Sequence, residues 1–423
     1  MAWSLANRKE RLHPIGESDQ RNDFQKDRDR ILYSSAFQRL AGITQIVRAG
    51  EESIFHTRQQ HSIKVAQVGR RLAQAMKVAH EELAEEAGLD EEVVEAACLI
   101  HDLGHPPFGH VGETILDQKV TPEVGAGFEG NAQSFRIITK LAVRKEAYAG
   151  MNLTRATLAA SLKYPWLRGP QGTPENRKWS VYDLEQEEFK FAREFHEGKK
   201  KTVEAELMEW ADDIAYSVHD LEDFHRCGAV PWAEIFNSTE GKARIVKAMP
   251  ADRDYEKSFD HLGALIFGVF SEVLRERYQG TRNQRWVLRS MTSNLISLYI
   301  NSVALEKEEG EVCVKVADEA LRQVRLLKQI TKDHIISTPP LAAQQIGYGK
   351  IIGELYDIFH DEGKKGLPSF TPVRLRYLWE LSGGTTARFA ADCIASLTED
   401  EAMAMHARLT GYISGSVLDP IIR

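Results

Sequence analysis

Apolar side chains recur at helical spacing along most of the chain, and this periodicity constrains the fold more than any other feature. Behind His61 the apolar positions that share one helix face are Ile63, Val65, Val68, Leu72, Ala75 and Met76. Helical spacing also runs through residues 19–40, 184–226 and most of 252–306, 315–335 and 343–362. Strand-like segments are few, so the sequence predicts an all-α fold.

Two stretches interrupt the helical pattern. Residues 41–57 contain glycines and β-branched side chains, which favours at most a small β-hairpin there. Residues 163–180 combine glycine, proline and polar side chains, which predicts a long loop of the kind that is often functional. No internal repeat or low-complexity linker divides the chain, so we expect residues 1–423 to form a single large helical unit.

The composition indicates a cytoplasmic protein. Hydrophobic residues make up 43% of the chain, enough for a sizeable core. No apolar run approaches the ~18–20 residues of a membrane span, and the opening segment lacks the apolar core of a signal peptide. The cysteines, at positions 98, 227, 313 and 393, are scattered, which favours reduced thiols. We therefore expect a cytoplasmic protein without a membrane partner.

The charge balance limits the partners of the chain. With 54 basic and 62 acidic residues, its formal charge is −8. An acidic chain is a poor general ligand for nucleic acid. A phosphorylated substrate would need locally placed arginines and lysines, or a metal ion.

The chemistry is concentrated in residues 96–113, "AACLIHDLGHPPFGHVGE". Neutral imidazole and carboxylate groups are good ligands for divalent first-row metals. Adjacent His101 and Asp102 point about 100° apart on an ideal helix, so they converge on one ion only near a helix end. The "LGHPP" that follows Asp102 contains the glycine and prolines that end helices.

Further ligands must come from other parts of the chain. His61 lies at the start of the long amphipathic helix. Asp212, Tyr216 and Asp220 recur every four residues, which places all three on one helix face. Any one of these residues is more often structural than functional, and His105 is as well explained by loop packing as by support of a metal ligand. Their occurrence together, in order, favours a metal site.

The motifs resemble a known family. In chain order they are "HTRQQHSIKVAQVGR", "HDLGHPPFGHVGE", "FEGNAQSFRI", "LKYPW" and "ADDIAYSVHDLED". Over residues 19–412 the chain resembles the dGTPase-like family of HD-domain deoxynucleotide triphosphohydrolases. It departs from the family's usual "RLTH" with "RQQH" at 58–61, and from "GMTD" with "SLTE" at 396–399. Neither departure removes a proposed metal ligand, and the second would alter an interface or a contact at the end of the substrate.

The resemblance implies hydrolysis of deoxynucleoside triphosphates, dGTP and other dNTPs, to deoxynucleoside and triphosphate. It implies one divalent ion per subunit, Mn²⁺ or Mg²⁺ with Fe²⁺, Co²⁺ or Ni²⁺ as alternatives, held by His61, His101, Asp102 and Asp212. A mixed nitrogen and oxygen set suits these ions better than a closed zinc site. His110 is the expected proton carrier because imidazole titrates near neutral pH. Glu113, one helical turn on, would orient it.

The resemblance also suggests how a substrate is held. Arg58, Lys163 and Lys178, with Tyr164, are the candidates for binding phosphates. Gln45 and Asp220 suit hydrogen bonds to a 3′-hydroxyl, and the ring of Tyr216 would exclude a 2′-hydroxyl. Two further substrate-binding candidates are Asn131 and Arg388.

The resemblance divides the chain into a catalytic HD-domain core, residues 55–225, and a C-terminal helical region, residues 226–423, that completes the site and forms interfaces. It implies a homo-oligomer, with a hexamer expected, and single-stranded DNA as a further partner. Two alternatives stay open at this point. One is an HD-domain phosphohydrolase acting on another nucleotide, and the other is a non-catalytic nucleic-acid-binding regulator.

Overall fold

The computed structural model describes residues 3–14, 16, 19–46, 56–250, 254–413 and 422. Within them the chain forms twenty α-helices and one two-stranded antiparallel sheet, which confirms the all-α prediction. None of these helices is both long and apolar enough to cross a membrane.

Each stretch predicted as helical at 19–40 and 184–226 is divided into two helices, by residues 33–34 and 194–202 respectively. Eleven helices form the described N-terminal half. They are α1 (Leu5–Lys9), α2 (Asp23–Leu32), α3 (Ser35–Arg39), α4 (Arg58–Ala79), α5 (Glu81–Ala87), α6 (Glu91–Ile100), α7 (Gly109–Val120), α8 (Gly130–Arg136), α9 (Arg155–Ala160), α10 (Gln186–Arg193) and α11 (Val203–Arg226). The remaining elements are α12 (Trp232–Asn237), α13 (Thr239–Lys247), α14 (Asp254–Arg275), α15 (Arg282–Ile300), β1 (Val303–Glu308), β2 (Glu311–Val316), α16 (Asp318–Thr331), α17 (Pro339–Gly363), α18 (Leu378–Leu381), α19 (Thr386–Ala395) and α20 (Glu399–Leu409).

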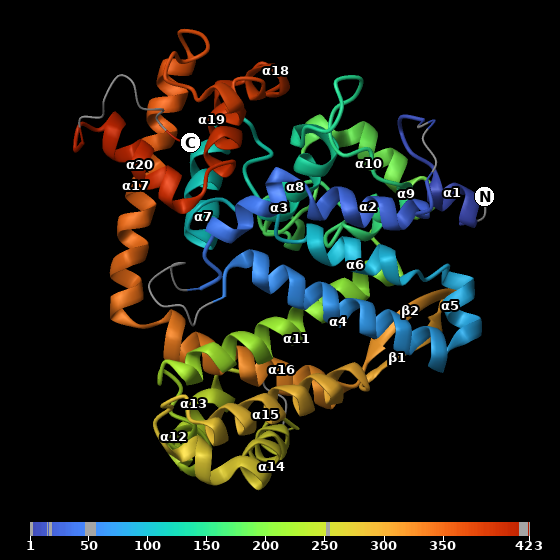
Figure 1. Cartoon of the computed structure of the whole chain (residues 1–423), viewed down its shortest axis with the longest axis vertical. Coiled ribbons are helices and arrows are strands. Elements are labelled where there is room, and N and C mark those ends of the chain that lie inside the picture. The colour runs from blue at the N-terminus through green and yellow to red at the C-terminus, as the bar shows by residue number, and fades with distance from the viewer. Residues whose placement is uncertain are drawn as a thin grey trace.

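Three helices, α4, α6 and α11, pack against one another in the middle of the molecule (Figure 1). The apolar face predicted for α4 is buried here through Val65, Val68 and Leu72. A β-carbon at Gly69 would lie 2.5 Å from Sγ of Cys98 on α6, so glycine permits this close approach of the two helices. The predicted metal site lies on the same three helices, at the beginning of α4, at the end of α6 and in the middle of α11.

The C-terminal region wraps around this centre. Helix α16 packs on α11, and the long helix α17 runs along one side of the molecule to meet α7, α19 and α20 (Figure 1). At the junction, buried Arg136 of α8 pairs with Asp392 of α19 at 2.8 Å and with Glu185 at 2.5 Å. Packing and buried ion pairs therefore join the C-terminal helices to the N-terminal half.

The sheet does not lie where the sequence predicts a hairpin. Most of the predicted hairpin at 41–57 falls on residues 47–55, outside the described residues, and beside them an isolated antiparallel bridge joins Thr44 and Thr57. The described sheet pairs β1 with β2 in the register Val303↔Val316. The helical prediction at 303–306 and 315–316 is therefore wrong. Glu309 and Gly310, both with positive φ, form the tight turn that brings the two strands together.

Candidate functional site

A cavity of about 590 Å³ lies between the central helices and the C-terminal region. Twelve of the fifteen predicted site residues line it, namely Gln45, Arg58, His61, His101, Asp102, His110, Asn131, Lys163, Tyr164, Lys178, Asp212 and Tyr216. The cavity therefore gathers residues that are more than 170 positions apart in sequence.

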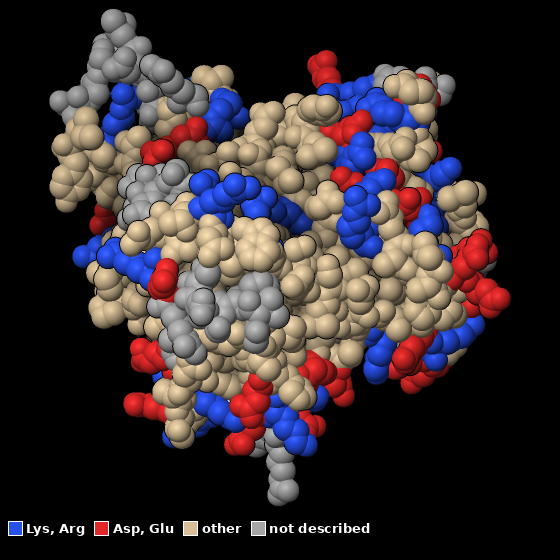
Figure 2. Space-filling view, turned by 60° about the horizontal axis from the view of Figure 1, so that its bottom comes forward, with Lys and Arg blue, Asp and Glu red and all other residues tan. Residues whose placement is uncertain are grey.

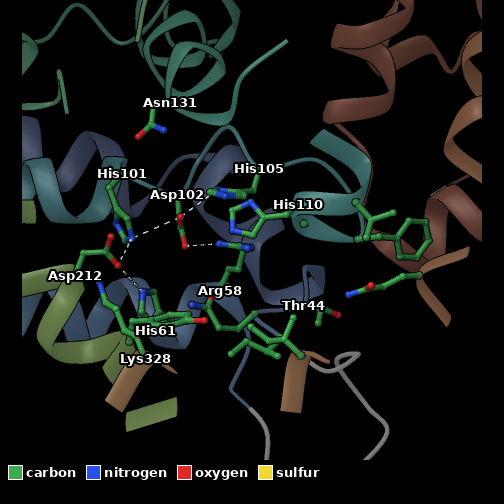
Figure 3. A pocket seen from close by; sticks show the side chains of 18 of the residues that line it. Thr44, Arg58, His61, His101, Asp102, His105, His110, Asn131, Asp212 and Lys328 are labelled. Atoms are coloured by element: carbon green, nitrogen blue, oxygen red, sulfur yellow. Dashed lines mark hydrogen bonds and ion pairs between the residues drawn. The ribbon is translucent and has the colours of Figure 1, made fainter. Parts of the chain in front are cut away.

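Three helix positions place the possible metal ligands. A capping box between Thr57 and Gln60 starts α4, so His61 lies in its first turn. Helix α6 ends at Ile100, and His101 is its C-cap, as the Gly-Pro signal predicts. Asp212 projects from the middle of α11. Ligand atoms of His61, His101 and Asp212 all lie within 4.8 Å of one another (Figure 3).

The two carboxylates of the cluster each have one oxygen paired with a cation. Arg58 binds Oδ2 of Asp102 at 2.8 Å, and Oδ1 of Asp102 lies 3.5 Å from Nε2 of His101. Lys163 binds Oδ2 of Asp212 at 2.8 Å, and Oδ1 of Asp212 lies 3.2 Å from Nε2 of His61 and 3.6 Å from that of His101. The second oxygen of each carboxylate thus faces the same point (Figure 3).

His101 is oriented toward that point by a hydrogen bond at its other ring nitrogen. Nδ1 of His101 lies 2.6 Å from the carbonyl oxygen of Cys98, so it carries the proton and donates it there. Nε2 of His101 is then an acceptor, and it is buried without a hydrogen-bond partner. On His61, Nδ1 lies 3.8 Å from Oδ1 of Asp220. A divalent ion fits this set of two imidazoles and two carboxylates, because it would bind the His101 nitrogen that has no hydrogen-bond partner.

The electrostatics keep the carboxylates ionised. Burial alone would raise the pKa of Asp102, but the charge of Arg58 holds it well below its usual range. Burial opposes ionisation of Asp212 in the same way, and Lys163 and His101 hold its pKa well below its usual range. Burial, together with Arg58, lowers the pKa of His105 to about 4, so this histidine is neutral at pH 7. His105 lies 3.0 Å from Asp102.

His110 lines the cavity from the first turn of α7, and its ring centre lies 5.4 Å from that of His105. Its Nδ1 lies 2.9 Å from Oε2 of Glu113, and its side chain is 75% exposed toward the open space. Burial would raise the pKa of Glu113, but the hydrogen bond with His110 and the charge of Lys178 hold it well below its usual range. An ionised Glu113 fixes the proton on Nδ1 of His110 and leaves Nε2 free to exchange a proton with a bound molecule.

A second glutamate, Glu129, acts with Glu113 to hold the side chain of Lys178. Lys178 lies 2.8 Å from Glu113 and 2.8 Å from Glu129. Glu129 also caps α8 and accepts a 2.8 Å hydrogen bond from the side chain of Asn131. Burial and the nearby Glu113 raise the pKa of Glu129 to about 7. Glu129 belongs to the "FEGN" motif but is not among the predicted site residues.

Three predicted residues are not in the lining. Glu113 lies behind His110, and Asp220 lies behind His61, where it accepts a 3.4 Å hydrogen bond from Gln45. Arg388 is buried elsewhere: its guanidinium lies 3.8 Å from the centre of the Tyr182 ring and donates to the carbonyl oxygen of Gly127. The structure therefore brings Glu113 and Asp220 to the site as supports and leaves Arg388 outside it.

The C-terminal region adds cavity residues that are not among the predicted site residues. Lys328 of α16 pairs with Asp213 at 2.5 Å, and its Nζ lies 5.9 Å from the centre of the Tyr216 ring. Tyr348 of α17 stacks on Phe108, with ring centres 4.2 Å apart. Glu399 of α20 also lines the cavity. The departure at 396–399 thus lies at the site.

The basic side chains that line the cavity are each held by a carboxylate and do not form part of a broad basic surface. On the face drawn in Figure 2, one group of lysine and arginine side chains lies near the middle, beside a wide area without charged residues, and elsewhere both signs are mixed. Four lining cations, Arg58, Lys163, Lys178 and Lys328, are each paired with a carboxylate of the site. The arrangement suits a compact polyanion that enters the cavity.

Comparisons with known proteins agree with this geometry. Residues 58–217 match the model of the HD domain, and residues 314–408 match that of the phosphohydrolase-associated domain. The chain is 35% identical to a deoxyguanosinetriphosphate triphosphohydrolase-like protein of Streptomyces coelicolor, over 93% of both chains. It is 33% identical to the protein of that name from Corynebacterium efficiens, over 94% of this chain and 93% of the relative. It is 32% identical to the protein of that name from Bifidobacterium longum, over 93% of this chain and 84% of the relative.

Proposed function

The chain belongs to the HD-domain family of deoxyguanosinetriphosphate triphosphohydrolase-like proteins, and from this premise we propose that it hydrolyses deoxynucleoside triphosphates to deoxynucleoside and triphosphate. The observation that carries the proposal is the buried, unpartnered Nε2 of His101 between Asp102 and Asp212, at one end of a cavity with four lining cations. The matched family supports hydrolysis of a phosphorylated nucleotide, and the substrate and the metal dependence are the proposed part.

The metal would be a single divalent ion, Mn²⁺ or Mg²⁺, held by His61, His101, Asp102 and Asp212. Such an ion supplies a Lewis acid for a phosphoryl oxygen and favours ionisation of water. The chain's own contribution is to keep the two carboxylates ionised through Arg58 and Lys163 and to orient His101 by its hydrogen bond to the Cys98 carbonyl oxygen.

The cations of the cavity would bind the triphosphate. Arg58, Lys163 and Lys178 already point into the cavity, where each is paired with a carboxylate oxygen. A triphosphate carries about four negative charges, and its oxygens accept charge-assisted hydrogen bonds from the donors that these pairs leave free. Lysine and arginine thus fix the position of the phosphates while the paired carboxylates stay ionised.

His110 would carry the proton that the reaction moves. Hydrolysis at the α-phosphorus forms one bond from phosphorus to the water oxygen and breaks the bond to O5′ of the sugar. O5′ must gain a proton as it leaves, and water must lose one. Nε2 of His110 is free for this exchange because Glu113 holds Nδ1.

The sugar would lie beside α11. The aromatic ring of Tyr216 lines the cavity, and Gln45 is hydrogen-bonded to Asp220 on the same helix face. A ring edge against the 2′ position excludes an added hydroxyl, which favours deoxynucleotides. Tyr164 and Asn131 complete the wall between Lys163 and Lys178.

Product analysis tests the proposal. The purified protein is incubated with Mn²⁺ or Mg²⁺ and each dNTP, singly and mixed, and the products are resolved by ion-exchange chromatography. Deoxynucleoside with tripolyphosphate is the expected result. Monophosphate or orthophosphate would mean an HD-domain phosphohydrolase with another reaction. No turnover in a protein that still binds metal would favour the non-catalytic regulator.

The proposal extends to the assembly and location of the protein. Residues 55–225 would form the catalytic core, and residues 226–423 would complete the site and supply contacts in a homo-oligomer, with a hexamer expected. Light scattering coupled to size exclusion measures that mass directly. Single-stranded DNA is a further proposed partner, tested by fluorescence anisotropy with a labelled oligonucleotide, and the cytoplasm is the proposed compartment.

A further inference from the structure

Glu399 joins two walls of the cavity that are far apart in sequence. Its Oε1 accepts hydrogen bonds from the backbone N–H of Thr44 at 2.9 Å and of Phe108 at 3.2 Å. Its Oε2 accepts from the hydroxyl of Thr44 at 2.5 Å. The residue is only 3% exposed although it lines the cavity. Three donors from two separate segments therefore converge on one buried carboxylate.

These contacts are not needed to start helix α20. Thr398 is its N-cap, and the capping box is completed by Glu401, whose carboxylate accepts from the N–H of Thr398 at 2.8 Å. Glu399 is thus surplus to the capping of its own helix. Its side chain instead turns toward residues 44 and 108.

Arg39 makes the complementary contacts at the same place. Its guanidinium donates to the carbonyl oxygens of Leu103 and His105, both at 2.8 Å, and of Leu397 at 3.1 Å. Arg39 as donor and Glu399 as acceptor therefore connect the start of α20 to the motif loop, residues 103–108. The positively charged side chain binds carbonyl oxygens of this loop, and the negatively charged one binds a backbone N–H of the same loop.

The loop that Glu399 holds determines where His110 points. Phe108 has a φ of +64°, a left-handed conformation that side chains larger than glycine adopt at a cost, and Gly109 follows with a φ of +56°. Helix α7 begins at Gly109, so His110 is in its first turn. The Phe108 conformation is retained by the hydrogen bond of its N–H to Glu399 and by the stack of its ring on Tyr348.

We propose that Glu399 is a positioning residue of the site. By holding Thr44 and the Phe108 turn together, it fixes His110 on one wall and Gln45, the neighbour of Thr44, on the other. Glu399 acts through these residues, since the hydrogen bonds given above that its carboxylate accepts all come from protein groups. The effect on turnover rests on the proposed function, and the effect on the two segments does not.

Two measurements on one set of variants test this. Glu399→Ala removes the acceptor, and Glu399→Gln keeps one oxygen for the two N–H groups. Glu401→Ala is the matched control, because it weakens the cap of the same helix and leaves residues 44 and 108 untouched. Steady-state kinetics give kcat and KM for the best dNTP, and hydrogen–deuterium exchange follows peptides over 42–46 and 104–110.

Glu399→Ala is expected to lower kcat by ~100-fold, the size of loss that follows a displacement of a reacting group by about 1 Å. KM changes less, because Lys163 and Lys178 lie on other segments and are held by Asp212, Glu113 and Glu129. Exchange over both peptides becomes faster. Glu399→Gln restores kcat and slow exchange to near the wild-type values, and Glu401→Ala alters neither.

Unchanged kcat and exchange in Glu399→Ala would overturn the proposal, and so would an equal loss of kcat in Glu401→Ala. If the wild-type protein hydrolyses no dNTP, the proposed function fails, and exchange alone decides: faster exchange in Glu399→Ala supports the positioning role and unchanged exchange overturns it. If Glu399→Ala does not fold, Glu399→Leu, which fills the space without an acceptor, replaces it in both measurements.

Discussion

Nζ of Lys163 lies 2.8 Å from Oδ2 of Asp212, and the other oxygen of that carboxylate faces His61 and His101. One carboxylate thus connects a cation suited to phosphate with two imidazoles suited to a metal. The next residue, Asp213, pairs with Lys328 on α16 instead. Neighbouring aspartates on one helix therefore have separable roles.

We expect Asp212→Asn to weaken Mn²⁺ binding by more than about 100-fold. Loss of a partner that only supports a metal ligand costs ~10–100-fold in affinity, and Asp212 would be a ligand itself. Titration calorimetry with Mn²⁺ measures the change. Asp213→Asn is the matched control and should bind Mn²⁺ like the wild type. Equal affinity in both variants would remove Asp212 from the metal site.

His110→Ala should lower kcat by ~10²–10⁴-fold and leave the metal content unchanged, because a positioned general acid or base contributes about that factor. The side chain is 75% exposed, so the melting temperature should also stay the same. His261→Ala is the control, since His261 forms a comparable exposed pair with Glu319 at 3.3 Å. Full activity in His110→Ala would assign the proton transfer to another group.

His225 makes the stability of the fold depend on pH. Burial lowers its pKa from 6.5 to about 4, and its Nδ1 accepts a 2.8 Å hydrogen bond from the indole of Trp232. Because the folded pKa lies below the unfolded value, neutral His225 contributes stability above pH 6.5, and this contribution is lost as the pH falls toward 4. His225→Asn offers an amide oxygen in place of Nδ1 and does not titrate.

The melting temperature of the wild type relative to His225→Asn should therefore decrease between pH 6.5 and pH 4.5. Differential scanning calorimetry at several pH values measures both proteins. His261→Asn, at an exposed position, should follow the wild type throughout. Parallel curves for wild type and His225→Asn would show that this histidine does not contribute to acid sensitivity.

The sequence predicted the features that depend on local order. The apolar period of α4 forms a buried face, and the Gly-Pro signal after Asp102 ends α6 at the metal cluster. His61 and Asp212 were predicted as ligands from motifs on two periodic helices that resemble the family. These signals are carried by neighbouring residues and need no knowledge of the packing of the C-terminal region.

Contacts made at long range were not predicted. Tyr348 reaches the cavity because α17 packs against α7, and nothing in its own neighbourhood indicates it. For Glu399 the "SLTE" departure indicated a contact at an interface or at the substrate, but not the hydrogen bonds to Thr44 and Phe108. Arg388, by contrast, was predicted to bind substrate, but it is buried against Tyr182 and does not line the cavity. The hairpin at 303–316 was missed although its Glu-Gly turn between β-branched residues was a local signal.

Arg136 provides the last prediction, because it links the two halves of the chain. Its guanidinium is 1% exposed and pairs with Glu185 and Asp392, which are fully buried. Arg136→Met would leave two buried carboxylates without their cation, and breaking such a pair costs about 3–5 kcal/mol. Urea denaturation followed by circular dichroism measures the loss in free energy of unfolding. Arg374→Met is the control, since Arg374 is 42% exposed in its pair with Glu401 and exposed pairs contribute about 0–1 kcal/mol. A similar small loss in both variants would mean that the buried cluster does not hold α8 to α19.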